Sequence, residues 1–321
     1  MALRLFIENP PPFKKHRRWL EDGTKTTIDG NIEEGLDAIR FYLDEAKLQP
    51  AGFHHSDIDP IESQKLRGDV PLSRFKTFDY ACYLKQQTPD FNGLWIPHHV
   101  GVYQTPAEQA SDFEAIAACG IHDAVIVGCP TDKPAPGVTY KASVGDVLAY
   151  LSEYQPDFTL GSIGIHLRPD EPERIAAKYR AAGGRLRIMG QFLDEADQAV
   201  EFIARLGEHF KREQLDLSGL EYNVGLAIFG LKNRGFYAGL LQKDGLDCED
   251  RFAGLDKQSQ RIEESVRMNL EFAERLLEAG HQHGVDIGFS IQPLIERTGK
   301  GKLHPAVHAA ADLAHKLEKL D

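Results

Sequence analysis

The sequence has neither a long apolar run nor a recognisable secretory leader. No stretch of its 321 residues approaches the roughly 18 consecutive apolar residues of a membrane-spanning helix. The first residues, MALRLFIENPPP, pass directly into a strand-like run, without the basic region, long apolar core and cleavage site of a signal peptide. We therefore expect a cytoplasmic protein with no membrane partner.

Basic residues are too few and too scattered to predict a nucleic-acid partner. The chain has 37 Lys and Arg against 49 Asp and Glu, which gives a formal net charge of −12. Binding to a phosphate backbone requires a basic patch or stripe. One compact basic run, KKHRR at 14–18, could meet a cofactor phosphate, but we interpret it as a solvated surface patch.

Cysteines are also few. Cys82, Cys119, Cys129 and Cys248 form no CxxC pair, which disfavours a structural zinc site. Their positions are typical of reduced thiols in a reducing compartment, so we expect no disulfide.

Phosphate-binding loops are missing, whereas a regular alternation of strand and helix patterns is present. Neither GxGxxG nor GxxxxGK[ST] occurs, which disfavours a doubly wound sheet. Short β-rich runs and helical patterns alternate close to eight times, with no linker or internal repeat. We therefore expect an α/β protein in which residues 1–321 form a single (βα)8 TIM barrel, with the Gly-punctuated segment 231–255 as a long loop over the mouth. The expected strands are 3–8, 51–57, 93–100, 123–129, 159–166, 187–193, 219–229 and 286–294, and the expected helices are 31–48, 74–87, 106–119, 143–154, 171–182, 195–212, 256–283 and 305–320.

Polar residues near strand ends are the candidates for chemistry, because such barrels build their active sites at the carboxyl ends of the strands. Glu8 ends an apolar strand ahead of Asn9 and three prolines. Burial would raise its pKa and suit a general acid, while a salt bridge to a Lys or Arg is the alternative. The full set is Glu8, His54, His55, His98, His99, Cys129, His166, Gln191, Glu221 and Gln292.

The sequence contains two pairs of adjacent histidines, which suggest a zinc site as one interpretation. Neighbouring residues of a strand point to opposite faces, so only one of His54 and His55, and one of His98 and His99, can enter the barrel lumen. We therefore expect no metal, and a structural role for at least one member of each pair.

Gln191 and Cys129 each allow two interpretations. Gln191 lies in the apolar strand RIMGQFL, where its amide either bonds to a neighbouring strand or offers a donor and an acceptor to a ligand. Cys129 lies between Gly128 and Pro130 and has no assignable His or Asp partner, so we favour a packing role over a nucleophile.

Four short motifs follow one another in an order typical of one enzyme family. They are FIENPPP at Glu8, PHHVGVYQTP from Pro97 to Pro106, Gly120-Ile121 before the fourth strand, and GQFLDE at Gln191. In this respect the chain resembles the methylenetetrahydrofolate reductases over most of its first two hundred residues, and the match weakens beyond them.

The resemblance implies reduction of 5,10-methylenetetrahydrofolate to 5-methyltetrahydrofolate by NADH or NADPH. Glu8 matches the family's general acid, Gln191 its pterin-binding glutamine, His98 a flavin-contacting histidine and Tyr140 a tyrosine that borders the flavin. From their places at the strand ends we also expect Cys129, Glu221 and Gln292 to contact the folate substrate, and His54 and His166 to contact the cofactor.

The end of the fourth strand departs from the family pattern. Flavin-dependent members carry Arg-Gly-Asp there, whereas this chain has Val127-Gly128-Cys129-Pro130. The segment GCPTDKPAPGV is more similar to the divergent, flavin-independent branch, in which a nicotinamide reduces the folate directly, with Asp132 as a stand-in for the missing acid. FAD thus remains an open alternative, as does a homo-oligomer. The rival activities are a folate-dependent methyl or one-carbon transferase (a demethylase), a deazaflavin-dependent reductase and a metal-dependent hydrolase.

Overall fold

A computed structural model gives the fold of most of the chain. It describes residues 3–12, 14–19, 25–56, 74–128, 139–192, 195–229, 257–293 and 302–320, together with residues 66, 67, 70, 71, 252, 254 and 255 between them.

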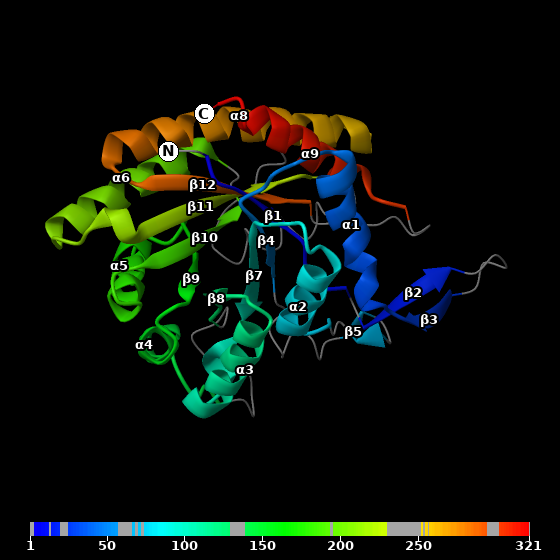
Figure 1. The fold of residues 1–321 in the computed structure, drawn as a ribbon. Helices are drawn as coiled ribbons and strands as arrows, with labels where there is room; N and C mark the ends of the chain where they lie inside the picture. Colours follow the sequence, from blue (N-terminus) through cyan, green and yellow to red (C-terminus); the bar gives the residue numbers. More distant parts are fainter. Residues whose placement is uncertain are drawn as a thin grey trace.

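Eight parallel strands close into a barrel (Figure 1), which confirms the predicted (βα)8 architecture. Around the barrel the strands follow the order β1-β12-β11-β10-β9-β8-β7-β4. Each strand therefore lies beside its sequence neighbour in the barrel, as right-handed βα units require. The barrel strands are β1 (Leu5–Glu8), β4 (Gly52–His55), β7 (Leu94–His99), β8 (Asp123–Ile126), β9 (Thr159–Gly164), β10 (Leu186–Phe192), β11 (Leu220–Ala227) and β12 (Asp286–Gln292).

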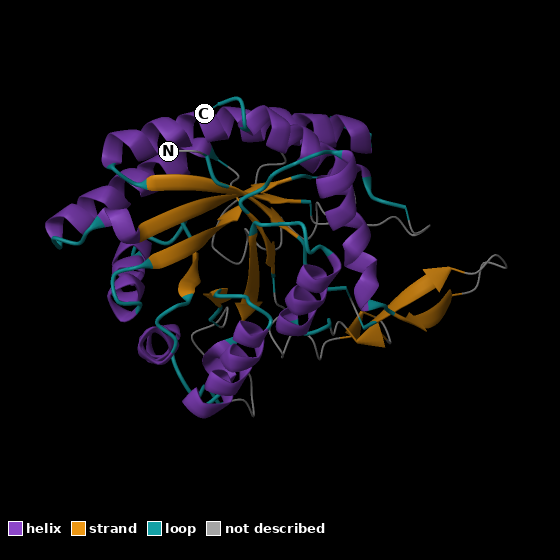
Figure 2. Cartoon of the chain, in the orientation of Figure 1, coloured by secondary structure: helices purple, strands orange, loops and turns teal. Residues whose placement is uncertain are grey.

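Helices surround the strands (Figure 2). Their predicted end signals are present: Thr105 forms a capping box with Glu108 at the start of α3, and Gly120 and Gly183 adopt φ of +71° and +70° after α3 and α5. The helices are α1 (Leu36–Arg40), flanked by a 3-10 turn at Ile32–Gly35 and a π-helical turn at Phe41–Glu45, α2 (Thr77–Gln87), α3 (Pro106–Ala118), α4 (Val144–Tyr154), α5 (Glu171–Ala181), α6 (Ala196–Arg212), α8 (Gln258–His283) and α9 (Pro305–Leu317).

Two short antiparallel ribbons were not predicted. β2 (Lys15–Trp19) pairs with β3 (Lys25–Asp29), and β5 (Leu66–Arg67) pairs with β6 (Val70–Pro71). The first ribbon projects from the side of the barrel (Figure 1) and contains most of the basic run 14–18. Most of segment 231–255, predicted to cover the mouth, lies outside the described residues.

The barrel separates an inner cluster of apolar side chains from the main core between strands and helices. Phe6, Ile96, Val125 and Met189 form the inner cluster, while Ile7, next to Phe6, belongs to the main core. This difference follows from the alternation of side chains along a strand. The inner cluster marks which residues of each strand face the lumen.

An ion-paired arginine closes the amino end of the lumen. The Arg187 Nη1 lies 2.5 Å from Asp123 Oδ1, and its Nε lies 2.7 Å from Glu221 Oε2. All three residues lie at the beginnings of their strands. The predicted place of Glu221 at the barrel mouth is therefore wrong: it is the second residue of β11, at the opposite end, where its carboxylate neutralises a buried guanidinium.

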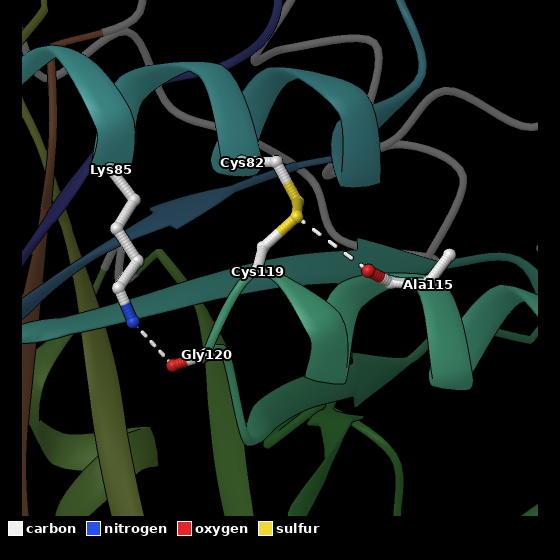
Figure 3. Close-up of a disulfide and its surroundings, with 5 residues drawn as sticks. All are labelled: Cys82, Lys85, Ala115, Cys119 and Gly120. Carbon is white, nitrogen blue, oxygen red and sulfur yellow. Dashed lines mark hydrogen bonds between the residues drawn. A yellow bond between two sulfur atoms is a disulfide. The ribbon is translucent and has the colours of Figure 1, made fainter.

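A disulfide joins Cys82 on α2 to Cys119 at the end of α3 (Figure 3). The prediction that these two cysteines are reduced thiols is therefore wrong, because the packing of α2 against α3 brings their Cα atoms to 5.7 Å. Nearby, Lys85 Nζ donates to the carbonyl oxygen of Gly120. The argument from reduced thiols to a reducing compartment no longer applies, so a cytoplasmic location stays a prediction.

Removal of this disulfide tests its contribution to stability. Because it links residues 37 apart, the double change Cys82→Ala and Cys119→Ala should lower the free energy of unfolding by about 2–4 kcal/mol, through the larger entropy of the unfolded chain. Urea unfolding of both proteins, with and without a dithiol reductant, measures the difference. The unfolding curves of the wild type and of the double variant should coincide in reductant. Equal stability of the two proteins without reductant would contradict the pairing. Two reactive thiols at these positions in the native wild type would contradict it as well.

Candidate active site

Five of the predicted site residues lie at the carboxyl ends of the strands, and four of them face the lumen. Phe6 and Ile96 belong to the inner cluster, and the residue two places further along a strand shares its face. His54 pairs in register with Glu8 and Ser290 with Phe6, so His54 and Gln292 point to the same side. The four lumen residues are Glu8 on β1, His54 on β4, His98 on β7 and Gln292 on β12, and the fifth residue, Gln191, lies at the end of β10.

Glu8 is a carboxyl group whose surroundings favour the protonated form. Burial raises the pKa of Glu8, while a hydrogen bond from Ser56 and the positive charge of Arg74 oppose that shift. The raised pKa favours the general-acid interpretation of Glu8 over a salt bridge, although the Arg74 charge acts on the same carboxyl group.

Asn9, which sequence reasoning did not single out, fixes the backbone directly after Glu8. Its N–H donates to the carbonyl of His54 at 2.9 Å, and its own carbonyl lies 2.7 Å from His55 Nδ1. Its side chain accepts from the Tyr80 hydroxyl and donates to the carbonyl of Gly35 at 3.4 Å. Gly35 is required here, because a Cβ would overlap the Tyr80 hydroxyl. This network prevents the end of β1, and Glu8 with it, from shifting.

The lumen members of the histidine pairs contact each other and a serine. His54 Nδ1 lies 3.2 Å from His98 Nε2, and His54 Nε2 lies 2.5 Å from the Ser290 hydroxyl oxygen. The two rings stack with centroids 5.2 Å apart and planes at 17°. Burial lowers the pKa of His54 well below its usual value and that of His98 to about 3, so both rings are neutral near pH 7.

The other members of the pairs point outward and are structural, as predicted from strand alternation. His55 stacks on Trp95 with centroids 5.7 Å apart, and His99 stacks on Phe78 at 4.9 Å. Burial lowers the pKa of each to about 4. One member of each pair therefore enters the lumen and the other packs against the helices.

Gln191 and Gln292 lie half-buried at the mouth. The pairing of β10 with β11 shifts register between Met189 and Phe192, so Gln191 lies at an irregularity of the strand, and bulges of this kind commonly redirect a side chain near an active site. Gln292 ends β12, the strand on the opposite side of β1 from His54. Both amides thus lie around the same opening as Glu8.

His166 and Tyr140 lie on segments that follow strands. The buried His166 ring follows β9, and burial lowers its pKa to about 4. Its Nδ1 has no hydrogen-bond partner among the described residues, so a polar group of a bound ligand would complete its bonding. The Tyr140 ring lies 5.5 Å from that of Tyr103. Cys129, Asp132 and Asp194 fall outside the described residues.

Ser290 and Asn223 were missed as lumen residues. Asn223 is fully buried, and its side-chain oxygen occupies the space that a Cβ on Gly288 would need. The sequence did contain a signal for Ser290, because Gly288, Ser290 and Gln292 alternate with the apolar residues of DIGFSIQ.

The described part of the chain contains neither a metal-binding cluster nor a membrane-spanning helix. There, no three or more His, Cys, Asp or Glu side chains lie close enough together to hold a metal ion. No described helix combines the length and the apolar character needed to cross a bilayer.

Comparisons with known proteins support the architecture. No protein-family model and no curated protein matches the sequence. Among solved structures, the chain is similar to an uncharacterised protein from Clostridium thermocellum that binds two copies of 5-methyl-5,6,7,8-tetrahydrofolic acid, with a TM-score of 0.70, 15% identity, and coverage of 100% of this chain and 96% of that one. It is also similar to the EDTA monooxygenase EmoA from Chelativorans sp. BNC1, with a TM-score of 0.53, 10% identity, and coverage of 99% and 94%. At these identities the likeness shows that the chain shares the fold of these barrels.

Proposed function

We propose that the chain is an enzyme that binds a reduced folate at the barrel mouth and reduces 5,10-methylenetetrahydrofolate to 5-methyltetrahydrofolate with NADH or NADPH. The observation that carries this proposal is Glu8, a lumen-facing carboxyl group at the end of β1 whose pKa is raised by burial. The four motifs described above support it. So does the structurally similar Clostridium thermocellum protein, whose ligand is the product of this reaction.

In this reaction Glu8 donates its proton to N10 of the folate, and the bond between N10 and the methylene carbon breaks. The methylene group remains on N5 as an iminium cation, which a hydride converts to a methyl group. The reduced nicotinamide supplies this hydride and is itself oxidised. Glu8 then recovers a proton from solvent, so each turnover consumes one hydride and one proton.

The residues around Glu8 fit this role. Since His54 and His98 are neutral, no imidazolium in the lumen draws the proton from Glu8. Gln191 can offer both a donor and an acceptor to the pterin ring. The Nδ1 of His166, which has no partner among the described residues, can bond to a polar group of the pterin or of the nicotinamide.

The proposal does not depend on FAD. Instead of the family's arginine, the residue after β8 is Val127, and its backbone N–H donates to the His99 carbonyl at 2.8 Å. This difference favours direct reduction of the folate by the nicotinamide. The visible absorption spectrum of the purified protein distinguishes a flavoprotein from a colourless reductase.

Turnover tests the proposed reaction. The purified protein is incubated with methylenetetrahydrofolate and either NADH or NADPH, nicotinamide oxidation is followed by absorbance, and the folate product is identified by mass spectrometry. We expect 5-methyltetrahydrofolate and oxidised nicotinamide in equal amounts. Absence of both with either nicotinamide, in the presence and absence of added FAD, would reject the reductase.

A folate-dependent methyl transferase is the second candidate. It is favoured by the methylated ligand of the Clostridium thermocellum protein, since a methyl transferase that uses tetrahydrofolate forms or consumes the same compound. Binding of tetrahydrofolate without any nicotinamide oxidation would favour this activity over the reductase.

A further inference from the structure

A hydrogen bond joins the two strands that flank β1, between the register partners of Phe6 and Glu8. β12 and β4 flank β1, with Ser290 opposite Phe6 and His54 opposite Glu8. The contact of 2.5 Å between Ser290 Oγ and His54 Nε2 therefore connects the strands on either side of β1. It spans the interval between the Phe6 and Glu8 side chains, which share the lumen face.

Both ring nitrogens of His54 are occupied. A neutral imidazole has one N–H and one acceptor nitrogen. Whichever His54 nitrogen carries the proton, the Ser290 hydroxyl can donate to Nε2 or accept from it. The His98 ring can likewise donate to Nδ1 or accept from it, 3.2 Å away. Since the His54 ring is buried and stacked on His98, it cannot turn without losing these contacts.

We propose that Ser290 and His54 are positioning residues for Glu8: Ser290 holds the His54 ring in place, and the held ring excludes water from the base of the Glu8 carboxyl group. The inference rests on the proposed reductase function, in which Glu8 is the acid. Neither residue touches the reacting atoms; both act through Glu8.

The groups around Ser290, His54 and Glu8 are compatible with this positioning role. His98 on β7 is the neighbour of His54 in the lumen, while His55 points to the outer side of β4 and contributes a weaker repulsion. Around Glu8, Ser56 donates a hydrogen bond and Arg74 contributes positive charge. Arg74 is held by a bond from its Nη1 to the carbonyl of Pro11 at 2.5 Å. Burial is thus the main influence that raises the pKa of Glu8, and admission of water would lower that pKa.

Ser290→Ala tests the inference, with Ser162→Ala as the matched control. Ser162 is also a buried serine of a barrel strand, but it pairs with the outward-facing Ile126 and Ile188. Ser290→Ala should lower kcat about tenfold with little change in KM, and should move the alkaline limb of the pH profile of kcat/KM to lower pH, because hydration of Glu8 lowers its pKa. A wild-type pH profile in Ser290→Ala, or an equal shift in Ser162→Ala, would overturn the inference.

The ring nitrogens of His54 provide a measurement that needs no turnover. In 15N NMR spectra of the whole protein, wild-type His54 should remain neutral through neutral pH, and its Nε2 signal should move in Ser290→Ala but not in Ser162→Ala. An unmoved signal overturns the inference even if the protein is an active reductase. A moved signal in a protein without reductase activity would instead reject the proposed function and, with it, the role of the pair in catalysis.

Discussion

Glu8→Gln should lower kcat by about 100- to 10,000-fold while folate affinity changes little, because the substitution removes the transferable proton and preserves the shape of the side chain. In the wild type, kcat/KM should fall as the pH rises through the pKa of Glu8. Burial raises this pKa, so the fall should occur at a higher pH than for an ordinary carboxyl group. Initial rates across pH, together with folate titrations, measure both effects.

Glu208→Gln is the appropriate control for this variant. Glu208 lies exposed on α6, away from the strand ends, so its replacement should leave the rate unchanged. Near-normal turnover in Glu8→Gln would remove Glu8 from the mechanism. A large loss of folate affinity that accompanies the loss of rate would make Glu8 a binding residue rather than the acid.

Stability should fall steeply as the pH drops below about 6.5, the usual pKa of histidine in an unfolded chain. Burial lowers the pKa of five histidines among the described residues of the folded protein, so between the unfolded and folded pKa values the unfolded state binds more protons. Between its unfolded and folded pKa values, each histidine lowers the free energy of unfolding by up to about 1.4 kcal/mol for each unit that the pH falls. The sum over several histidines approaches the whole free energy of unfolding of a typical domain. The five are His55, His99 and His166, each with a pKa of about 4, His98, with a pKa of about 3, and His54.

In the described part of the chain, two carboxyl groups oppose this trend. Burial raises the pKa of Glu8 and of Glu171, so the folded state binds more protons at these positions as the pH falls. The histidines outnumber these carboxyl groups. The net effect near pH 6 should therefore be destabilisation.

Urea unfolding at a series of pH values measures this dependence. His99→Phe, which keeps an aromatic ring against Phe78 but cannot titrate, should make the slope shallower. Replacement of the exposed His281 by glutamine should not alter it. A stability that stays flat between pH 7 and pH 5 would contradict the conclusion that these rings are buried in the neutral form.

The barrel and the lumen histidines could be predicted because both depend on local patterns. Strand and helix periodicities and the cap at Thr105 are properties of short segments, and alternation alone separates His54 from His55. Glu8 could be located for the same reason, since a carboxylate that ends the first strand must lie at the mouth.

The remaining features depend on contacts between distant segments. The disulfide requires α2 and α3 to pack side by side, which no spacing between Cys82 and Cys119 reveals. Ser290 acquires its role only when β12 and β4 flank β1. Glu221 was misplaced because it was chosen as a polar residue near the limit of a predicted strand, without regard to which end it occupied.

Equilibrium binding of 5-methyltetrahydrofolate to the wild type and to Gln191→Leu tests the central claim, that the barrel mouth is a reduced-folate site, most directly. We predict that the wild type binds this folate, and that Gln191→Leu weakens binding about tenfold or more through the loss of hydrogen bonds to the pterin. Gln282→Leu, an exposed change on α8, should bind as the wild type does. A wild type that does not bind, or a Gln191→Leu variant with unchanged affinity, would contradict a folate held between Glu8 and Gln191.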